Sequence, residues 1–281
     1  MQVSYAYIQA FVAQLDALNA QAGKVIVIEA KKRDLERKLS ESELDFEDVY
    51  SILAGIAPTY SKLASALTCN FYDGIRRGAN VPSEFDAEVY GSVSKKDLMA
   101  SARKVYADVE QGTNTVPLTK LLSDEVTSFT RRASNETVYR NAAKDPAHPR
   151  YAVVPSPSAC VLCQLVAANG YEYPSEQSAQ RYAHSIHDHC NCQATQVYGD
   201  DAIQGYDPKK YEDAYDKAAK RYRSGEISDD LARRIEAAKA RHEERYAQYK
   251  RDKEKGIPTV EVPKWRDTNA ILMVWREQNK E

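Results

Sequence analysis

Hydrophobic residues recur at helical spacing through the first part of the chain. Across residues 4–22 they follow the i, i+3, i+4, i+7 pattern of an amphipathic helix, and Gly23 is placed to end that helix. Residues 25–38 predict a second helix that becomes strongly charged toward its end. Residues 40–44 have the composition of a linker, so we expect the chain to begin with two separate helices.

Two residues that favour helix starts divide the next hydrophobic stretch. Asp45 can cap a short helix through Leu53, because its carboxylate can accept hydrogen bonds from the unpaired N–H groups of a first turn. Pro58 suits the first turn of another helix, where its missing N–H is not needed, and Gly78 is placed to stop that helix. The prediction is therefore two helices in this stretch.

Loop and helix signals alternate in the following residues. Residues 81–92 are loop-like, and Ser94 is placed to cap the helix that follows. Pro117 opens another helix, which an Asp-Pro pair at residues 145–146 then breaks. The N-terminal half of the chain is thus expected to be a body of several helices.

The C-terminal part has a different composition. Residues 207–255 carry one thin stripe of Tyr and Ala among charges of both signs, with a break at Ser224-Gly225 and a capping residue at Ser228. We expect a solvated helical hairpin, because a nucleic-acid-binding arm would need a larger excess of positive charge. Residues 269–278 predict a short apolar helix, which should dock on the protein's own body or on a partner.

The composition of the whole chain argues against some classes of function. The formal net charge of −2 provides no global field that would drive the chain onto nucleic acid or an acidic membrane. The longest aliphatic run, residues 25–28, is far too short to cross a bilayer, so we expect no membrane partner. The first residues lack the basic start and apolar core of a signal peptide, and we expect no export.

The densest group of candidate metal ligands lies between residues 160 and 192. It holds four of the five cysteines and three of the five histidines. Cys160-Val-Leu-Cys163 can hold one ion from a tight turn, and a His-x-x-Cys pair follows it. Together the two pairs supply the four N and S ligands that tetrahedral zinc prefers. We predict a structural Zn site made by Cys160, Cys163, His187 and Cys190, with Cys192 as the rival for the fourth position.

Three other interpretations of these cysteines stay open. They can be small buried hydrophobic residues, as Cys69 is expected to be in its helix. They can form a disulfide, which would require an oxidising compartment. Cys160 and Cys163 can be a thioredoxin-type redox pair, although the strand–helix context of such a pair is missing. Two complete half-motifs close together in sequence favour the metal.

The same motif argues for a structural role. A catalytic zinc keeps one coordination position for water, whereas five or six candidate ligands in one place favour a closed site. The deaminase pattern and the His-Glu-x-x-His pattern are both absent from the sequence. Asp188-His189 resembles part of a His-Asn-His nuclease, but the remaining residues of that site do not follow at usable spacing. We therefore predict no catalytic residues and no enzyme.

Two short segments beside the metal motif are expected to be extended. Residues 151–154 lead into the motif and residues 193–198 alternate enough to be a strand, so a small sheet next to the metal is expected. The predicted fold class is mainly α, with a multi-helix body, a small α+β zinc-knuckle region and a C-terminal helical hairpin. The corresponding parts are residues 1–150, 151–204 and 205–281.

Several stretches of the chain carry a resemblance to one known family. They are Tyr72-Asp-Gly-Ile-Arg76, residues 131–140 before Asp145-Pro, Val154-Pro-Ser-Pro-Ser-Ala-Cys160-Val-Leu-Cys163-Gln-Leu-Val-Ala-Ala, Gly170-Tyr-Glu-Tyr-Pro-Ser175 and His187-Asp-His-Cys190-Asn-Cys192. Together they resemble the Mu-F-like minor capsid proteins of tailed bacteriophages, also called head morphogenesis proteins, and most of all those of actinobacteriophages. The likeness covers about residues 58–204 and is most specific over residues 155–192. The family motif falls on Cys160, Cys163, His187, Cys190 and Cys192.

This resemblance implies a structural protein present in a few copies inside the procapsid. Such a protein associates with the portal vertex and supports head assembly and DNA packaging or ejection. The implied partners are the portal protein and the major capsid and scaffold proteins, with packaged DNA left open. The implied location is the virion interior near the portal, after assembly in the host cytoplasm. Two alternatives stay open, a zinc-stabilised phage enzyme (nuclease or capsid maturation protease) and a DNA-binding ejection factor.

Overall fold

The chain forms two compact units, each drawn from two separated stretches of sequence. The computed structural model describes residues 3–110, 116–157, 159–170, 192–199, 202–257, 259, 262 and 264–279. The first unit contains Met1–Pro157 and Tyr171–Tyr206, and the second contains Ser158–Gly170 and Asp207–Glu281. The three consecutive parts expected from the sequence stay a prediction.

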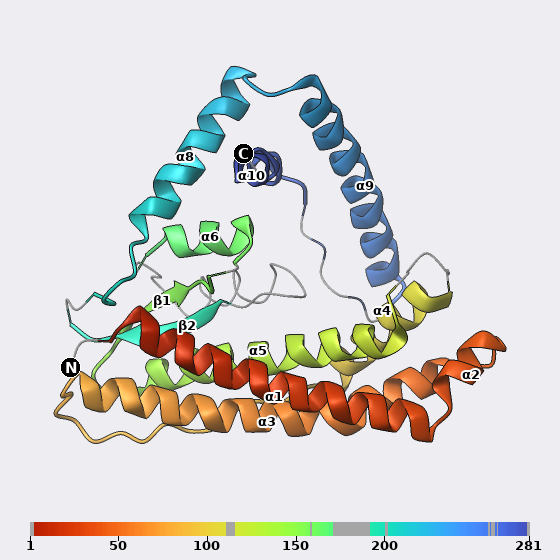
Figure 1. Cartoon of the computed structure of the whole chain (residues 1–281), viewed down its shortest axis with the longest axis horizontal. Coiled ribbons are helices and arrows are strands. Elements are labelled where there is room, and N and C mark those ends of the chain that lie inside the picture. The colour runs from red at the N-terminus through yellow and green to blue at the C-terminus, as the bar shows by residue number, and fades with distance from the viewer. Residues whose placement is uncertain are drawn as a thin grey trace. The chain divides into compact units, whose positions relative to one another are not determined.

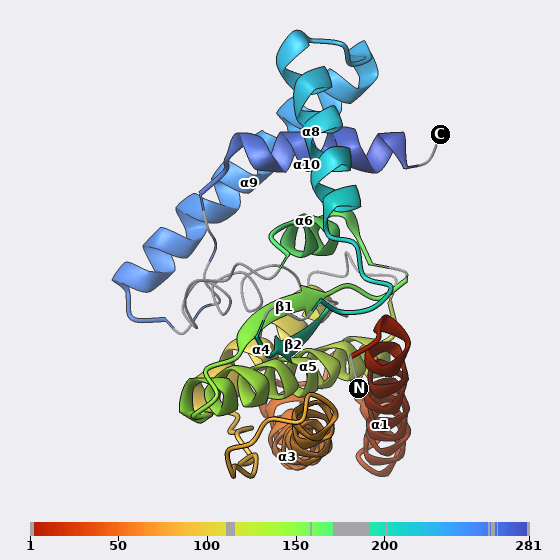
Figure 2. The same ribbon diagram turned by 90° about the vertical axis from the view of Figure 1, so that its left-hand side faces the viewer.

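Long helices dominate the first unit (Figure 1). The helices in its described part are α1 (Tyr5–Lys32), α2 (Leu35–Ser40), α3 (Phe46–Gly78), α4 (Lys95–Glu110) and α5 (Leu118–Lys144). Figures 1 and 2 show α1, α3 and α5 side by side, and these three helices contact one another. The apolar core between the helices includes Ile26, Leu35, Val49, Ile52, Leu53, Leu98, Leu122 and Val126.

The prediction that Gly23 ends the first helix was wrong. α1 continues through this glycine to Lys32, and Ala22, Ile26 and Ala30 on either side of it are all buried. The apolar stripe therefore extends beyond Gly23, and its burial outweighs the roughly 1 kcal/mol that a glycine inside a helix costs relative to alanine. α1 therefore includes residues 25–32 of the expected second helix, and residues 35–38 of that helix belong to α2.

The prediction that Pro58 opens a new helix was also wrong, whereas the cap at Asp45 is confirmed. The Asp48 N–H donates to Asp45 Oδ1 at 2.8 Å, and the Asp45 N–H donates to Asp48 Oδ2 at 3.3 Å, which together form a capping box. Pro58 lies inside α3, where an interior proline costs about 3 kcal/mol or more. Ile56 and Ala57 directly before it are buried, so tertiary packing carries the helix past the proline.

A two-stranded antiparallel sheet completes the first unit. β1 (Arg150–Val154) pairs with β2 (Gln193–Val197), and Ala152 lies opposite Thr195 in the register. All five residues of β2 are buried, which is unusual for so small a sheet and follows from its packing against α5. The expected strands at residues 151–154 and 193–198 are confirmed.

The second unit consists, in its described part, of four helices around a separate core. They are α6 (Val161–Ala168), α8 (Lys209–Ser224), α9 (Asp229–Glu254) and α10 (Asp267–Gln278). The predicted break falls at Gly225, which has a φ of 73°, and the predicted cap is confirmed because the Leu231 N–H donates to Ser228 Oγ at 3.2 Å. The two expected helices therefore follow one another on either side of this break, and they diverge from the turn (Figures 1 and 2).

The C-terminal helix is the centre of the second core. α10 packs against α8, α9 and α6, and its Ile271 and Trp275 are 2% and 1% exposed. The apolar helix expected at residues 269–278 is therefore confirmed, and it docks on its own unit. No helix in the described part of the chain is long and apolar enough to span a bilayer.

Candidate functional site

The Cys-x-x-Cys motif forms the start of α6. Cys160 is the N-cap residue with extended backbone angles, and Cys163 is the third residue inside the helix. Residues three apart at a helix start project from the same side of the first turn. Gln164 braces this turn, because its N–H donates to the Cys160 carbonyl at 3.0 Å and its Nε2 donates to the Ala159 carbonyl at 2.9 Å. The two sulfur atoms are thus brought together by local geometry.

The distance between the two sulfur atoms suits a shared zinc ion. The Cys160 thiol donates to the Cys163 sulfur across 3.7 Å. Two thiolates bound to one tetrahedral zinc at about 2.3 Å would lie about 3.8 Å apart. The N-terminal end of the helix also favours the negative charge of such thiolates. This half of the predicted site therefore has the separation that the metal requires.

Hydrophobic packing holds the motif in place. Val161, next to Cys160, is 4% exposed and belongs to the core formed by Ala218, Ile271 and Trp275. Cys163 is 2% exposed, whereas Cys160 is half-buried. The pair is therefore mounted on a helix that is anchored to α8 and α10.

The other predicted ligands are not all within the described residues. His187 and Cys190 lie outside them. Cys192 is described, lies in the first unit and is 2% exposed, and its carbonyl accepts a hydrogen bond from Asn135 Nδ2 at 3.3 Å. Within the described ranges no group of three or more His, Cys, Asp or Glu side chains is arranged to hold a metal ion. The four-ligand site stays a prediction.

Cys69 is distant from the motif in sequence and belongs to the first unit. It is a buried residue of α3, and burial raises the pKa of its thiol to about 11. A thiol with a raised pKa is a poor nucleophile and a poor metal ligand at neutral pH. The structure confirms Cys69 as a core residue.

A buried aspartate at the end of α5 accepts hydrogen bonds from several parts of the first unit, and the sequence reasoning missed it. Asp145 is 0% exposed. Its Oδ2 accepts hydrogen bonds from Tyr72 Oη at 3.0 Å, Tyr198 Oη at 2.8 Å and Arg76 Nε at 3.1 Å. Its Oδ1 accepts from the Ala147 N–H at 2.9 Å. The end of α3, the end of α5 and the residue after β2 thus meet at one carboxylate, and we call these four side chains the Asp145 cluster.

The hydrogen bonds at Asp145 stabilise the negative charge of its buried carboxylate. Burial alone would raise the pKa of this carboxyl group, but the Ala147 N–H, Arg76 and the two tyrosine hydroxyls together hold the pKa below its ordinary value. Arg76 is itself 7% exposed and also donates to Ser83 Oγ at 2.6 Å. The cluster is a compensated ion pair in the interior, which suits a structural clamp.

Polar side chains on α5 connect this clamp to the rest of the first unit. Asn141 Nδ2 donates to the Glu88 carbonyl at 2.8 Å, and the Glu88 N–H donates to Asn141 Oδ1 at 2.7 Å, which fixes the loop before α4. Asn135 Oδ1 accepts from the Ala194 N–H at 2.8 Å at the start of β2. The buried polar residues of α5 therefore supply hydrogen-bond partners to backbone groups of the loop and of the sheet edge that have none in secondary structure.

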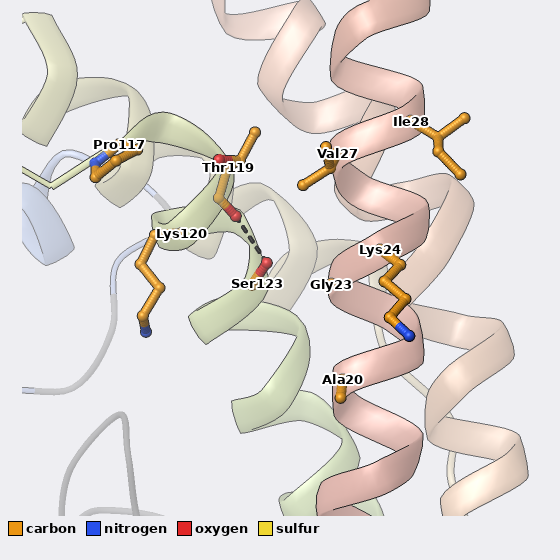
Figure 3. Close-up of a pocket in the computed structure, with 9 residues that line it drawn as sticks. All are labelled: Ala20, Gly23, Lys24, Val27, Ile28, Pro117, Thr119, Lys120 and Ser123. Carbon is orange, nitrogen blue, oxygen red and sulfur yellow. Dashed lines mark hydrogen bonds between the residues drawn. The ribbon is translucent and has the colours of Figure 1, made fainter.

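An open groove of about 670 Å³ lies between α1 and the start of α5 (Figure 3). Its lining is Ala20, Gly23, Lys24, Val27, Ile28, Pro117, Thr119, Lys120 and Ser123. The hydroxyl of Ser123 in this lining donates to the Thr119 carbonyl at 2.7 Å, and the Lys120 ammonium pairs with Asp124.

Comparison with known proteins identifies the class of this chain. The model of the VG15 protein family matches residues 2–218, so the chain belongs to the VG15 protein family. This is a family of viral proteins, and the match supports a bacteriophage origin. No curated protein and no solved structure matches the chain. The match includes the Asp145 cluster and the Cys160–Cys163 pair, and it ends within α8.

The Asp145 cluster also explains a pattern that the sequence left unconnected. Tyr72 and Arg76 lie in one of the stretches on which the resemblance to Mu-F-like proteins was based, and Asp145 follows shortly after another, residues 131–140. The structure brings these three residues together in a single hydrogen-bonded group. Tyr72 and Arg76 are four residues apart and share a helix face, which is the one local signal that could have indicated a common partner.

Proposed function

We propose that this viral protein is a minor capsid, or head morphogenesis, protein that acts as a structural component of the virion near the portal vertex. Membership of the VG15 family over residues 2–218 is the observation that carries the proposal, because it establishes a viral protein. The resemblance of residues 58–204 to Mu-F-like proteins supplies the specific role. In this role the protein contacts the portal and the major capsid and scaffold proteins during assembly in the host cytoplasm.

The architecture is compatible with a structural role. The Asp145 cluster and the buried polar residues of α5 are engaged in bonds within the fold. In the groove between α1 and α5, the Ser123 hydroxyl and the Lys120 ammonium are likewise engaged, with the Thr119 carbonyl and with Asp124. Both features are expected of a protein whose surfaces, and not an active site, perform its function.

A structural zinc ion is part of this proposal. Cys160 and Cys163 would supply two thiolates from the start of α6, and the 3.7 Å between their sulfur atoms supports this. His187 and Cys190 complete the proposed set, with Cys192 as the rival for the last position. Zinc binding would then contribute directly to the folding of residues 155–198.

The proposal is tested by co-expressing the tagged chain with the portal protein of the same viral genome. Co-purification with the portal, together with a few copies per particle in mass spectrometry of purified virions, is the expected result. Absence from virions would refute the structural role. Divalent-ion-dependent nicking of plasmid by the purified chain would replace it with the nuclease alternative.

A further inference from the structure

Most cations in the second half of α9 lie on one side of the helix, together with two tyrosines. Arg241, Arg245, Tyr249 and Lys253 follow one another at four-residue spacing, and Tyr246 and Lys250 form the neighbouring row. Glu244 and Arg251 lie on the opposite side of the helix, and Glu243 and Glu254 lie next to Lys250 at the border between the two sides. Asp252, at the edge, accepts a hydrogen bond from Gln248 Nε2 at 2.8 Å. We call Arg241, Arg245, Tyr246, Tyr249, Lys250 and Lys253 the α9 basic strip.

The ion pairs of the described residues do not include the cations of the strip. Within the described residues, Arg241, Arg245, Lys250 and Lys253 form no ion pair, and all four are exposed. Lys253 Nζ instead lies 5.7 Å from the ring of Tyr249. Earlier on the same helix the pattern differs, because Arg234 pairs with Glu277 at 3.2 Å. Lys250 and Glu254 are four residues apart and could form an i, i+4 pair, but within the described residues the cations of the strip form none, so their charge is available to another partner.

We infer that the α9 basic strip binds the phosphate backbone of nucleic acid. From Arg241 to Lys253 the strip extends about 18 Å at 1.5 Å per residue, which faces about five phosphates of one duplex strand. The tyrosines between the cations can donate hydrogen bonds to phosphate oxygens or stack on unpaired bases. The strip carries no Leu, Ile, Phe or Trp, so it lacks the apolar face that insertion into a lipid surface requires.

This inference goes beyond family membership. α9 begins after residue 218, where the family match ends, so the strip is a feature of this chain outside the matched range. The setting in which nucleic acid would be met, the interior of a virion head, rests on the proposed function. Binding itself does not rest on it, because it is measured on the purified chain without portal or capsid proteins.

The experiment measures fluorescence anisotropy of a labelled 30-base-pair DNA duplex of arbitrary sequence with the full chain, between 50 and 200 mM salt. Four phosphate contacts predict a slope of log K against log salt of about −3.6, which is roughly a 150-fold loss of affinity over this range. Arg241→Gln with Arg245→Gln should reduce the magnitude of the slope by about 1.8. Lys209→Gln with Lys210→Gln on α8 removes the same charge outside the strip and should leave the slope unchanged.

Comparison of the two double variants distinguishes binding by the α9 basic strip from a general effect of positive charge. Equal weakening by both double variants, or no binding at 50 mM salt, would overturn the inference, provided that circular dichroism shows unchanged helix content. Binding to anionic lipid vesicles in place of DNA would overturn it as well. Tighter binding to a single strand than to the duplex, lost in Tyr249→Ala, would support it and assign the tyrosines to base stacking. Loss of DNA binding with retained portal association would refute the strip and leave the proposed function intact.

Discussion

Replacement of Asp145 tests whether the Asp145 cluster clamps the first unit. In Asp145→Ala the carboxylate that accepts from Tyr72, Tyr198 and Arg76 disappears. The Arg76 side chain is 8% exposed in its ion pair and would remain in the interior without a counter-charge. Removing one partner of a buried ion pair costs about 3–5 kcal/mol, because the remaining charge stays desolvated.

That loss should be visible as a lower melting temperature. For a folding unit of this size, each kcal/mol corresponds to about 2–4 °C, so we expect a decrease of roughly 6–20 °C. Differential scanning calorimetry or circular dichroism melting measures it. The matched control is Lys209→Ala, which removes an exposed ion pair with Asp213 on α8 and should leave the melting temperature almost unchanged.

The pH dependence provides a second readout that simple loss of packing would not change. The folded-state pKa of Asp145 lies below its ordinary value of about 3.9. Its stabilising contribution is therefore fully present above pH 4 and is lost as the pH falls through the folded-state pKa. Asp145→Asn keeps the size of the side chain but cannot titrate, so its stability should decline less steeply below about pH 4 than that of the unmodified chain.

Two results would refute this reasoning. One is an Asp145→Ala variant that melts within 2 °C of the unmodified chain. The other is an acid limb of the stability curve that is identical in Asp145→Asn and the unmodified chain. Either would mean that the hydrogen bonds at Asp145 contribute little, and that apolar packing of α3 on α5 alone holds this end of the unit.

Three further perturbations have defined outcomes. Elemental analysis of the unmodified chain should find roughly one zinc ion per chain. Cys160→Ser should lose this zinc, whereas Cys69→Ser in the core of α3 should retain it. An unmodified chain without zinc would contradict the proposal. Gly91→Ala should lower the melting temperature, because a Cβ at this position would lie 2.9 Å from a backbone oxygen of α3. The control Gly55→Ala should not lower it, since no atom lies within 4 Å of the added carbon, and equal effects of the two variants would contradict the steric argument. Trp275→Ala should destabilise the second unit by about 3–5 kcal/mol in urea unfolding, because a fully buried indole is lost, and an unchanged unfolding midpoint would show that α10 contributes little to that core.

Features that depend on neighbouring residues were predicted correctly from the sequence, whereas features that depend on burial against distant helices were not. Asp45 and Ser228 cap helices as expected, because a cap depends on the next three residues alone. Gly23 and Pro58 failed as helix boundaries, since their cost of about 1 and 3 kcal/mol is smaller than the burial gained by continuing the apolar stripe. Whether α1 continues past Gly23 and α3 past Pro58 could not be predicted without knowing that α5 packs against both helices.

The candidate sites show the same division. The spacing of Cys160 and Cys163 indicated their proximity, because three residues at a helix start fix it. The Asp145 cluster joins residues 72, 76, 145 and 198, and no window of sequence contains all four. The α9 basic strip was overlooked for a different reason: the total charge of residues 207–255 was considered, and not its distribution around the helix.

The division of the chain between its two units has a consequence for the order of events during synthesis. α6 carries the Cys160–Cys163 pair, but the residues that cover its apolar side belong to α8 and α10. Val161 therefore leaves the ribosome roughly 110 residues before Trp275, which at 5–20 residues per second is an interval of roughly 6–22 s. During this interval the two thiols lie on a segment without its hydrophobic support. A ribosome-bound chain that already presents Cys160 and Cys163 but still lacks Trp275 would expose the two thiols to oxidation or to the wrong metal.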